Sequence, residues 1–208
     1  MMRAYAQGRR QFGDTILPEG LKPYQKNPHP FITPTTKAAA FEHDVEITPK
    51  EIIDQKICDQ STWEQIEDYA FKLFHLGTQV LEQSQWLLVD TKYEFGFSKD
   101  QRLLVIDEFH TPDSSRFWVK GTYQERFEKG LAPEMLDKEN IRRWLLEHGY
   151  QGEGPVPQVP PEKTIELSQS YLRVFETLSG EPLVLKGTFP KDTSMWDALL
   201  RRLFATSR

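Results

Sequence analysis

The segment Leu87–Phe97, "LLVDTKYEFGF", decides how the chain is interpreted. An apolar run enters it and aromatic residues fill much of the remainder, yet Asp90, Lys92 and Glu94 are charged. Successive side chains of a strand point to opposite faces, so these three alternate positions share one face. The segment therefore predicts a strand with one charged face.

A second apolar run makes this strand half of a predicted antiparallel hairpin. Residues Trp86–Phe97 and Arg102–Glu108 flank the polar turn "SKDQ", as hairpin strands do. If Lys99–Arg102 form the loop, Asp107 lies directly across from Glu94. A slip of one residue would move the two carboxylates to opposite faces.

The predicted charged face has a functional and a structural interpretation. A two-residue loop would place Asp107 across from Lys92, and this register also keeps the charges together. Two carboxylates beside a lysine suit Mg²⁺ and phosphate, because Mg²⁺ takes one or two carboxylates together with phosphate oxygens. The alternative is a solvated sheet face whose ion pairs contribute about 0–1 kcal/mol each.

The polar segment Asp107–Trp118, "DEFHTPDSSRFW", directly follows the hairpin. Its Thr-Pro-Asp sequence, ending at Asp113, is typical of a turn. Ser114 and Ser115 offer hydroxyls, and Arg116 offers a bidentate fork for phosphate or carboxylate. The alternative is a structural Asp/Ser turn with an Arg–Asp pair, but the position after a charged hairpin favours a site.

The remainder of the chain predicts an α+β fold, an antiparallel hairpin or sheet packed with helices. Its 208 residues and 38% hydrophobic content suit one domain with a sizeable core. Thr48–Glu51 is a capping box with Pro at the first helical position, and Ser61–Glu64 is a second box. Asp137 is expected to cap another helix, and Gly180 ends a later one.

The two ends of the chain differ from the middle. Residues 1–37 are rich in proline and predict an irregular, extended segment. We expect residues 1–183 to form one domain and residues 184–208 to form an amphipathic helical extension. The extension's predicted helix starts at Ser194 and carries one apolar stripe: Trp196, Leu199, Leu200 and Leu203.

Charge and hydropathy argue against several classes of protein. The formal net charge of -5 disfavours a nucleic-acid partner, because an acidic chain repels phosphate backbones. No apolar run reaches the roughly 20 residues that span a bilayer, and the N-terminus has no apolar signal region. The single cysteine, Cys58, requires no oxidising compartment. We therefore expect a cytoplasmic protein with neither a nucleic-acid nor a membrane partner.

Three motifs resemble the signatures of phosphoribosylaminoimidazole-succinocarboxamide synthase, the SAICAR synthetase family: "LLVDTKYEFGF", "IDEFHTPDSSRFW" and "FITPTTKAAAFEHDVEIT". The resemblance runs from about Arg3 to about Leu183. It implies an ATP-grasp-like fold and an ATP-dependent carbon–nitrogen ligase of purine biosynthesis. Such a ligase uses ATP and Mg²⁺ to join L-aspartate to carboxyaminoimidazole ribonucleotide through an acyl phosphate.

The resemblance also implies roles for individual residues. Glu94 and Asp107 would hold Mg²⁺ on the nucleotide phosphates. Asp90 and Lys92 would act at the imidazole substrate and its reacting carboxylate. The residues implied in substrate binding lie in the "TPDSSR" turn and in the family's "K…HD" segment: Lys37, Asp44, Asp113, Ser114, Ser115 and Arg116.

The largest departure of the sequence from the family pattern is a missing region. The family's ATP-binding region, with its Gly-rich phosphate loop, has no match in this chain. We therefore expect the C-terminal portion of a synthetase, with a chain carrying the N-terminal half, or a homo-oligomer, as a partner. One alternative is a truncated, non-catalytic paralogue that acts as a binding or interaction module. Another is a metal-dependent phosphohydrolase that uses Asp90, Glu94 and Asp107.

Overall fold

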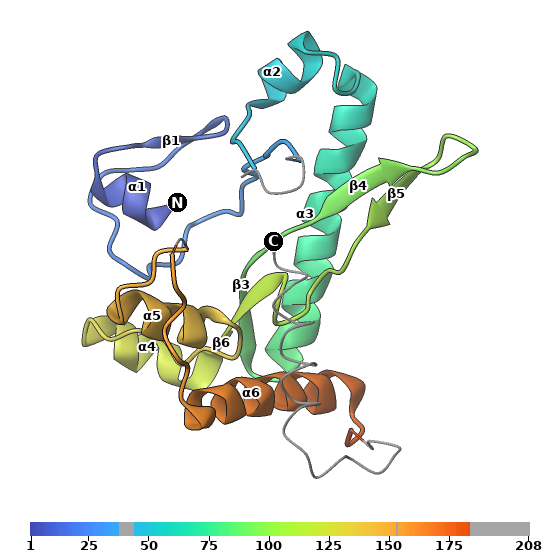
Figure 1. Cartoon of the computed structure of the whole chain (residues 1–208). Coiled ribbons are helices and arrows are strands. Elements are labelled where there is room, and N and C mark those ends of the chain that lie inside the picture. The colour runs from blue at the N-terminus through green and yellow to red at the C-terminus, as the bar shows by residue number, and fades with distance from the viewer. Residues whose placement is uncertain (38–43, 153, 184–208) are drawn as a thin grey trace.

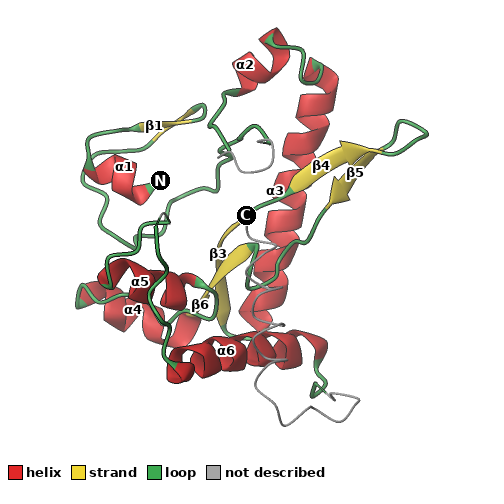
Figure 2. Ribbon diagram, in the orientation of Figure 1, coloured by secondary structure: helices red, strands yellow, loops and turns green. Residues whose placement is uncertain are grey.

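The computed structural model describes residues 1–37, 44–152 and 154–183 as a mixed α+β fold, which confirms the predicted class. Short antiparallel strand pairs lie among helices (Figures 1 and 2). The elements are, in chain order, α1 Met2–Ala6, β1 Gln11–Phe12, β2 Thr15–Ile16, α2 Pro49–Asp54, α3 Gln60–Gln83, β3 Trp86–Thr91, β4 Glu94–Phe97, β5 Leu103–Ile106, β6 Ser115–Val119, α4 Lys120–Glu128, α5 Glu139–Glu147 and α6 Pro161–Ser179.

The main core lies where α3, the β3–β6 pair and α6 meet. The long helix α3 runs most of the height of the molecule in Figure 1, and α6 crosses near its lower end. Burial of apolar side chains from these separate elements is the main stabilising contribution to such a core. The buried residues of this cluster are Leu81, Trp86, Leu88, Phe117, Leu136 and Val174.

Capping chemistry explains where helices α2 and α3 begin. The predicted box at Thr48 is confirmed, because Thr48 accepts the N–H of Glu51 and the Glu51 carboxylate accepts the N–H of Thr48. The second predicted box is wrong. Helix α3 begins at Gln60 because Asp59 caps it, accepting the N–H of Thr62 at 2.8 Å. An aspartate carboxylate satisfies a free N–H of the first turn as well as a serine hydroxyl does.

The predicted hairpin is confirmed for Glu94–Phe97, which pairs with the second predicted strand, and is wrong for Trp86–Thr91. The continuous strand breaks between Thr91 and Glu94. Strand β3 pairs with β6, which the sequence had placed in the polar segment, and β4 alone pairs with β5. The β3–β6 register also shifts between Leu88 and Asp90. Trp86 and Leu88 of β3 are buried in the same core cluster as Phe117 of β6, so both strands of this pair belong to the main core.

The N-terminal region contains more structure than its prolines predict. Residues expected to be irregular form α1 and the short β1–β2 pair. Tyr5, Phe12 and Leu17 are buried in a small cluster of their own. The hydroxyl of Tyr5 donates to the carbonyl of Pro18 at 2.6 Å, which ties the helix to the chain after β2.

Helix α6 ends at Gly180 as predicted, and this glycine adopts the left-handed conformation, φ 71°. Asp137, the expected cap of α5, is buried and accepts the N–H groups of Phe117 and Glu139, although the capping position itself is Lys138. The predicted extension, residues 184–208, lies outside the described residues. In the described ranges no helix has both the length and the hydropathy to cross a bilayer.

Candidate functional site

The register of the β4–β5 hairpin differs by one residue from the expected one. Glu94 pairs with Ile106, so Asp107 is not across from Glu94, and that prediction is wrong. The hairpin loop holds three residues, Lys99–Gln101, closed by the N–H of Ser98 on the carbonyl of Arg102 at 2.9 Å. A residue in the left-handed region commonly completes such a loop, and Gln101 has φ 60°.

Glu94 nevertheless forms the centre of a charged cluster. Its two carboxylate oxygens contact Lys37 Nζ at 2.5 Å and Lys92 Nζ at 2.7 Å. Lys37 comes from a loop 57 residues away. The two ammonium groups lower the pKa of Glu94, and hydrogen bonding to Glu94 raises the pKa of both lysines. Glu94 is therefore a carboxylate, and both lysines are charged, at neutral pH.

Two further carboxylates complete this Glu94 cluster. Asp44 Oδ2 lies 3.8 Å from Lys92 Nζ. The charge of Asp107 also raises the pKa of Lys37 and of Lys92, which places Asp107 near both. Asp107 has φ 64°, so it has left the strand, and strand alternation no longer determines where its side chain points. The structure thus brings these predicted residues together, although the hairpin register does not place Asp107 across from Glu94.

Asp90 lies in a second charged cluster, around Arg116. The guanidinium of Arg116 pairs with Asp90 across the β3–β6 ladder and with Glu139 of α5 at 3.2 Å. Asp90 and Lys92, both predicted to act at the reacting carboxylate, therefore make their ion pairs in different clusters. The two clusters are adjacent in the chain, because Lys92 donates its N–H to the carbonyl of Ser114 in the turn before Arg116.

The "TPDSSR" turn is held by its own hydroxyl groups. Thr111 Oγ1 accepts the N–H groups of Asp113 and Ser114, as a Thr/Ser turn requires. Ser115 is buried, and its hydroxyl donates to Thr91 Oγ1 at 2.8 Å. In this structure Ser115 therefore joins β6 to β3, and its expected role in lining the substrate site stays a prediction.

Asp113 belongs to a group that sequence reasoning did not identify in full. Burial acts to raise the pKa of Asp113, but Lys138 at 2.5 Å and a hydrogen bond with Glu108 lower it. Burial and the hydrogen bond with Asp113 raise the pKa of Glu108. Glu108 therefore holds a proton more readily than an isolated carboxyl group does, and Asp113 holds one less readily. Nothing in the spacing of Lys138 or Glu108 signals this contact, which only tertiary structure creates.

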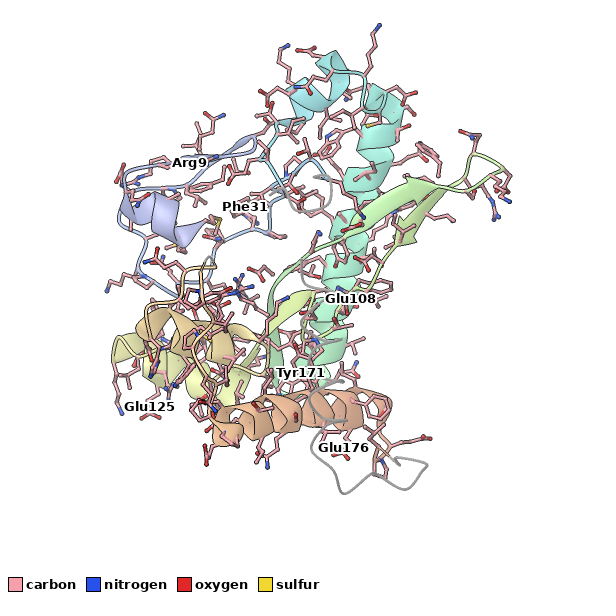
Figure 3. All side chains as sticks on the ribbon, viewed as in Figure 1. Arg9, Phe31, Glu108, Glu125, Tyr171 and Glu176 are labelled. Carbon is pink, nitrogen blue, oxygen red and sulfur yellow. The ribbon has the colours of Figure 1, made fainter. Side chains whose placement is uncertain are left out.

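Tyr171 is another neighbour that the sequence did not reveal. In Figure 3 it lies on the side of α6 that faces Glu108, whereas Glu176 lies further along the helix. Burial and then the charges of Asp113, Asp137 and Glu108 raise the pKa of the Tyr171 hydroxyl. It is therefore a neutral phenol beside several carboxylates.

The acidic residues suit Mg²⁺ only as partners of a phosphate ligand. In the described ranges no three His, Cys, Asp or Glu side chains form a group that could hold a metal ion. Mg²⁺ with bound phosphates needs only one or two protein carboxylates, which Glu94 and Asp107 can provide. The ammonium groups of Lys37 and Lys92 now hold the oxygens of Glu94, so a bound cation would take the place of at least one of them. The donor set fits under that condition.

The fold and the two clusters define an α+β protein with an exposed acidic and basic site beside a strand break. The family model of SAICAR synthetase matches residues 1–158. The chain is 45% identical over 188 residues to the phosphoribosylaminoimidazole-succinocarboxamide synthase of Azobacteroides pseudotrichonymphae, covering 89% of this chain and 58% of that protein. It is 44% identical to the Bacteroides fragilis enzyme, covering 89% and 60%. The chain therefore belongs to the SAICAR synthetase family.

A solved structure agrees with this assignment. The SAICAR synthase of Saccharomyces cerevisiae, complexed with SAICAR, superposes with a TM-score of 0.70 at 27% identity. The match covers 88% of this chain and 57% of the yeast chain. The chain thus spans about 60% of the length of the curated relatives.

Proposed function

We propose that this chain provides the magnesium- and substrate-binding part of a SAICAR synthetase active site. The observation that carries the proposal is the Glu94 carboxylate held between Lys37 and Lys92, with Asp44 and Asp107 beside it. The cluster lies within the segment that the family model matches. The substrates would be ATP, carboxyaminoimidazole ribonucleotide and L-aspartate.

In this proposal the chain's residues position reactants and neutralise charge. Phosphoryl transfer depends mainly on positioning and electrostatics, so no nucleophile from the protein is needed. The substrate carboxylate attacks the γ-phosphate of ATP, giving an acyl phosphate and ADP. The amine of L-aspartate then displaces phosphate and loses a proton, giving the amide. Bound Mg²⁺ would supply charge neutralisation at the phosphates.

The charged residues divide between these tasks. Lys92 would stabilise the reacting carboxylate and the charge that develops on the transferred phosphoryl group. Glu94 and Asp107 would hold the cation. Asp90 would contact the ribonucleotide, and Arg116 would bind its anionic groups as a bidentate fork. Ion pairs of Lys92 with Glu94 and of Arg116 with Asp90 orient these side chains.

We place the remaining contacts to ATP in the part of the relatives that the match with this chain does not cover. The side chain of Lys37 is 76% exposed and that of Lys92 is 58% exposed, so the Glu94 cluster is open on one side. Charge-assisted hydrogen bonds contribute most when water is excluded. An additional chain or segment that corresponds to the N-terminal part of the relatives would close this side.

The test is complementation. The purified chain is assayed for SAICAR formation alone and after joining to the N-terminal segment of the Bacteroides fragilis enzyme that the match leaves out. We expect turnover only from the joined protein, and its loss in a Lys92→Met variant. A Lys163→Met variant, altered in an exposed ion pair on α6, is the control. Robust turnover by the chain alone would contradict the need for a completing segment.

The same assay separates the ligase from a binding module. If the joined protein binds the ribonucleotide but forms no product under any nucleotide concentration, the non-catalytic alternative is supported. Release of phosphate from ATP without L-aspartate and without ribonucleotide would instead favour the phosphohydrolase.

A further inference from the structure

Helix α6 leaves an apolar stripe in solvent. Ile165, Leu172, Phe175 and Leu178 are 55%, 38%, 45% and 38% exposed, although they follow one another along the helix at helical spacing. The buried side of the helix is occupied by Val174. At 1.5 Å per residue the stripe is about 20 Å long. An apolar stripe of this kind on a helix normally faces a packing partner.

The chain turns back towards this stripe at the end of the described residues. Gly180 ends the helix in the left-handed conformation. The N–H of Leu183 then donates to Glu176 Oε1 at 3.3 Å, and the N–H of Glu181 donates to Ser179 Oγ at 3.2 Å. Leu183 therefore lies beside the last turn of α6.

The segment that follows, residues 184–208, has the composition to cover the stripe. It contains five basic and two acidic residues, whereas α6 and the residues to Leu183 contain four acidic and two basic ones. Its own apolar residues Trp196, Leu199, Leu200 and Leu203 recur at helical spacing. The ten residues 184–193 can span at most about 33 Å, which is enough to return along α6.

We infer that residues 194–204 dock against the stripe of α6 in the same chain, antiparallel to the helix. The contact buries the two apolar stripes against each other and brings Arg201 and Arg202 towards the acidic residues of α6. None of the residues that carry it belongs to the Glu94 cluster, so the inference does not depend on the ligase proposal.

Limited proteolysis of the full chain tests this contact. Trypsin cleavage after Arg201 and Arg202 releases the C-terminal peptides, which are followed by mass spectrometry. The variant carrying Leu172→Gln and Phe175→Gln should release them about tenfold faster, because undocking then becomes easier by the loss of buried apolar area. Thr177→Gln, an exposed position on the opposite side of α6, is the matched control and should change the rate less than about twofold.

Variants in the segment make the test specific. Leu199→Gln with Leu203→Gln should accelerate release by a similar factor, and combining both pairs should add little, since the two pairs break one contact. Equal release rates in all variants would overturn the inference. Protection that rises with protein concentration, together with a dimer in sedimentation that the α6 variant dissociates, would assign the stripe to a second copy and also overturn it.

Discussion

Tyr93 and His110 share a hydrogen bond of 2.6 Å between the tyrosine hydroxyl and Nε2 of the imidazole. Tyr93 stands in the break between β3 and β4, and His110 precedes the "TPDSSR" turn. Burial raises the pKa of Tyr93 and lowers that of His110, so both groups are neutral near pH 7. The bond therefore joins the strand break to the segment that precedes the turn.

Gly77 is expected to be essential for this arrangement. A Cβ at Gly77 would lie 2.4 Å from Cε1 of His110, far inside van der Waals contact. Alanine favours the helix by up to about 1 kcal/mol over glycine, but overpacking costs about 1–3 kcal/mol. We expect Gly77→Ala to lower the free energy of unfolding by about 1–2 kcal/mol in urea denaturation.

Two variants control this prediction. Gly121→Ala lies in helix α4 with no atom within 4 Å of the new Cβ, and should not destabilise the protein. Adding His110→Ala to Gly77→Ala removes the overlapping ring, so the second substitution should cost less there than in the wild-type background. If Gly77→Ala is as harmless as Gly121→Ala, the close packing of His110 on α3 is wrong.

Glu94 should control the titration of both lysines. In Glu94→Gln the carboxylate that raises the pKa of Lys37 and of Lys92 is lost. Both pKa values should fall, and ¹³C-detected NMR titration of the lysine side chains measures this directly. Glu166→Gln, which disrupts the exposed pair with Lys163 on α6, should leave both unchanged. Unaltered titration in Glu94→Gln would mean that the cluster does not form in solution.

Arg116 should not be replaceable by lysine. Its guanidinium contacts Asp90 on one side and Glu139 on the other, which one ammonium group cannot do with the same geometry. We expect Arg116→Lys to destabilise by about 1–2 kcal/mol in urea denaturation, from loss of a charge-assisted hydrogen bond. Arg102→Lys, in an exposed pair with Asp100, should cost less than about 0.5 kcal/mol. Equal effects would contradict the bridging role.

Asp137 should make stability depend on pH in an unusual direction. Burial raises the pKa of Asp137 to about 6, above the value in an unfolded chain. Its contribution is therefore complete below about pH 4 and is lost as pH rises through about 6. Relative to Asp137→Asn, the wild type should lose about 2 kcal/mol of unfolding free energy between about pH 4.5 and pH 7.

The Asp137→Asn comparison cancels the titration of other groups. Glu94 and Asp113, whose pKa values are lowered, give the opposite slope in both proteins. Urea unfolding of the pair at several pH values isolates the Asp137 term. A pH-independent difference between the two proteins would show that this carboxyl titrates normally.

Local chemistry allowed much of the fold to be predicted from the sequence. The capping box at Thr48 and the helix end at Gly180 were predicted because hydrogen bonding within one turn and the freedom of glycine at positive φ are encoded in a few neighbouring residues. The family follows from its motifs for a similar reason. A continuous run such as Asp107–Trp118 is specific without knowledge of its contacts.

Strand pairing was beyond the reach of these local rules. A single left-handed residue, Gln101, set the loop length and shifted Asp107 out of register with Glu94. Likewise the partner of β3 proved to be β6, a strand far along the chain whose Phe117 is buried in the same core as Trp86 and Leu88. A loop that is one residue shorter shifts the strand register, but the pattern of apolar and polar residues within each strand stays the same. The pattern alone therefore does not determine the register.

The sequence alone thus determined which charges the site contains, and the tertiary structure determined which of them meet. Asp90, Lys92 and Glu94 are alternate residues of one segment, and this much is local. The Lys92–Glu94 pair is also local, but two other ion pairs are not, because Glu94 is paired with Lys37, 57 residues earlier, and Asp90 with Arg116, 26 residues later. Contacts over such separations form only when the core brings their backbones together, since the entropy lost in closing each loop is offset by burial and not by the ion pairs.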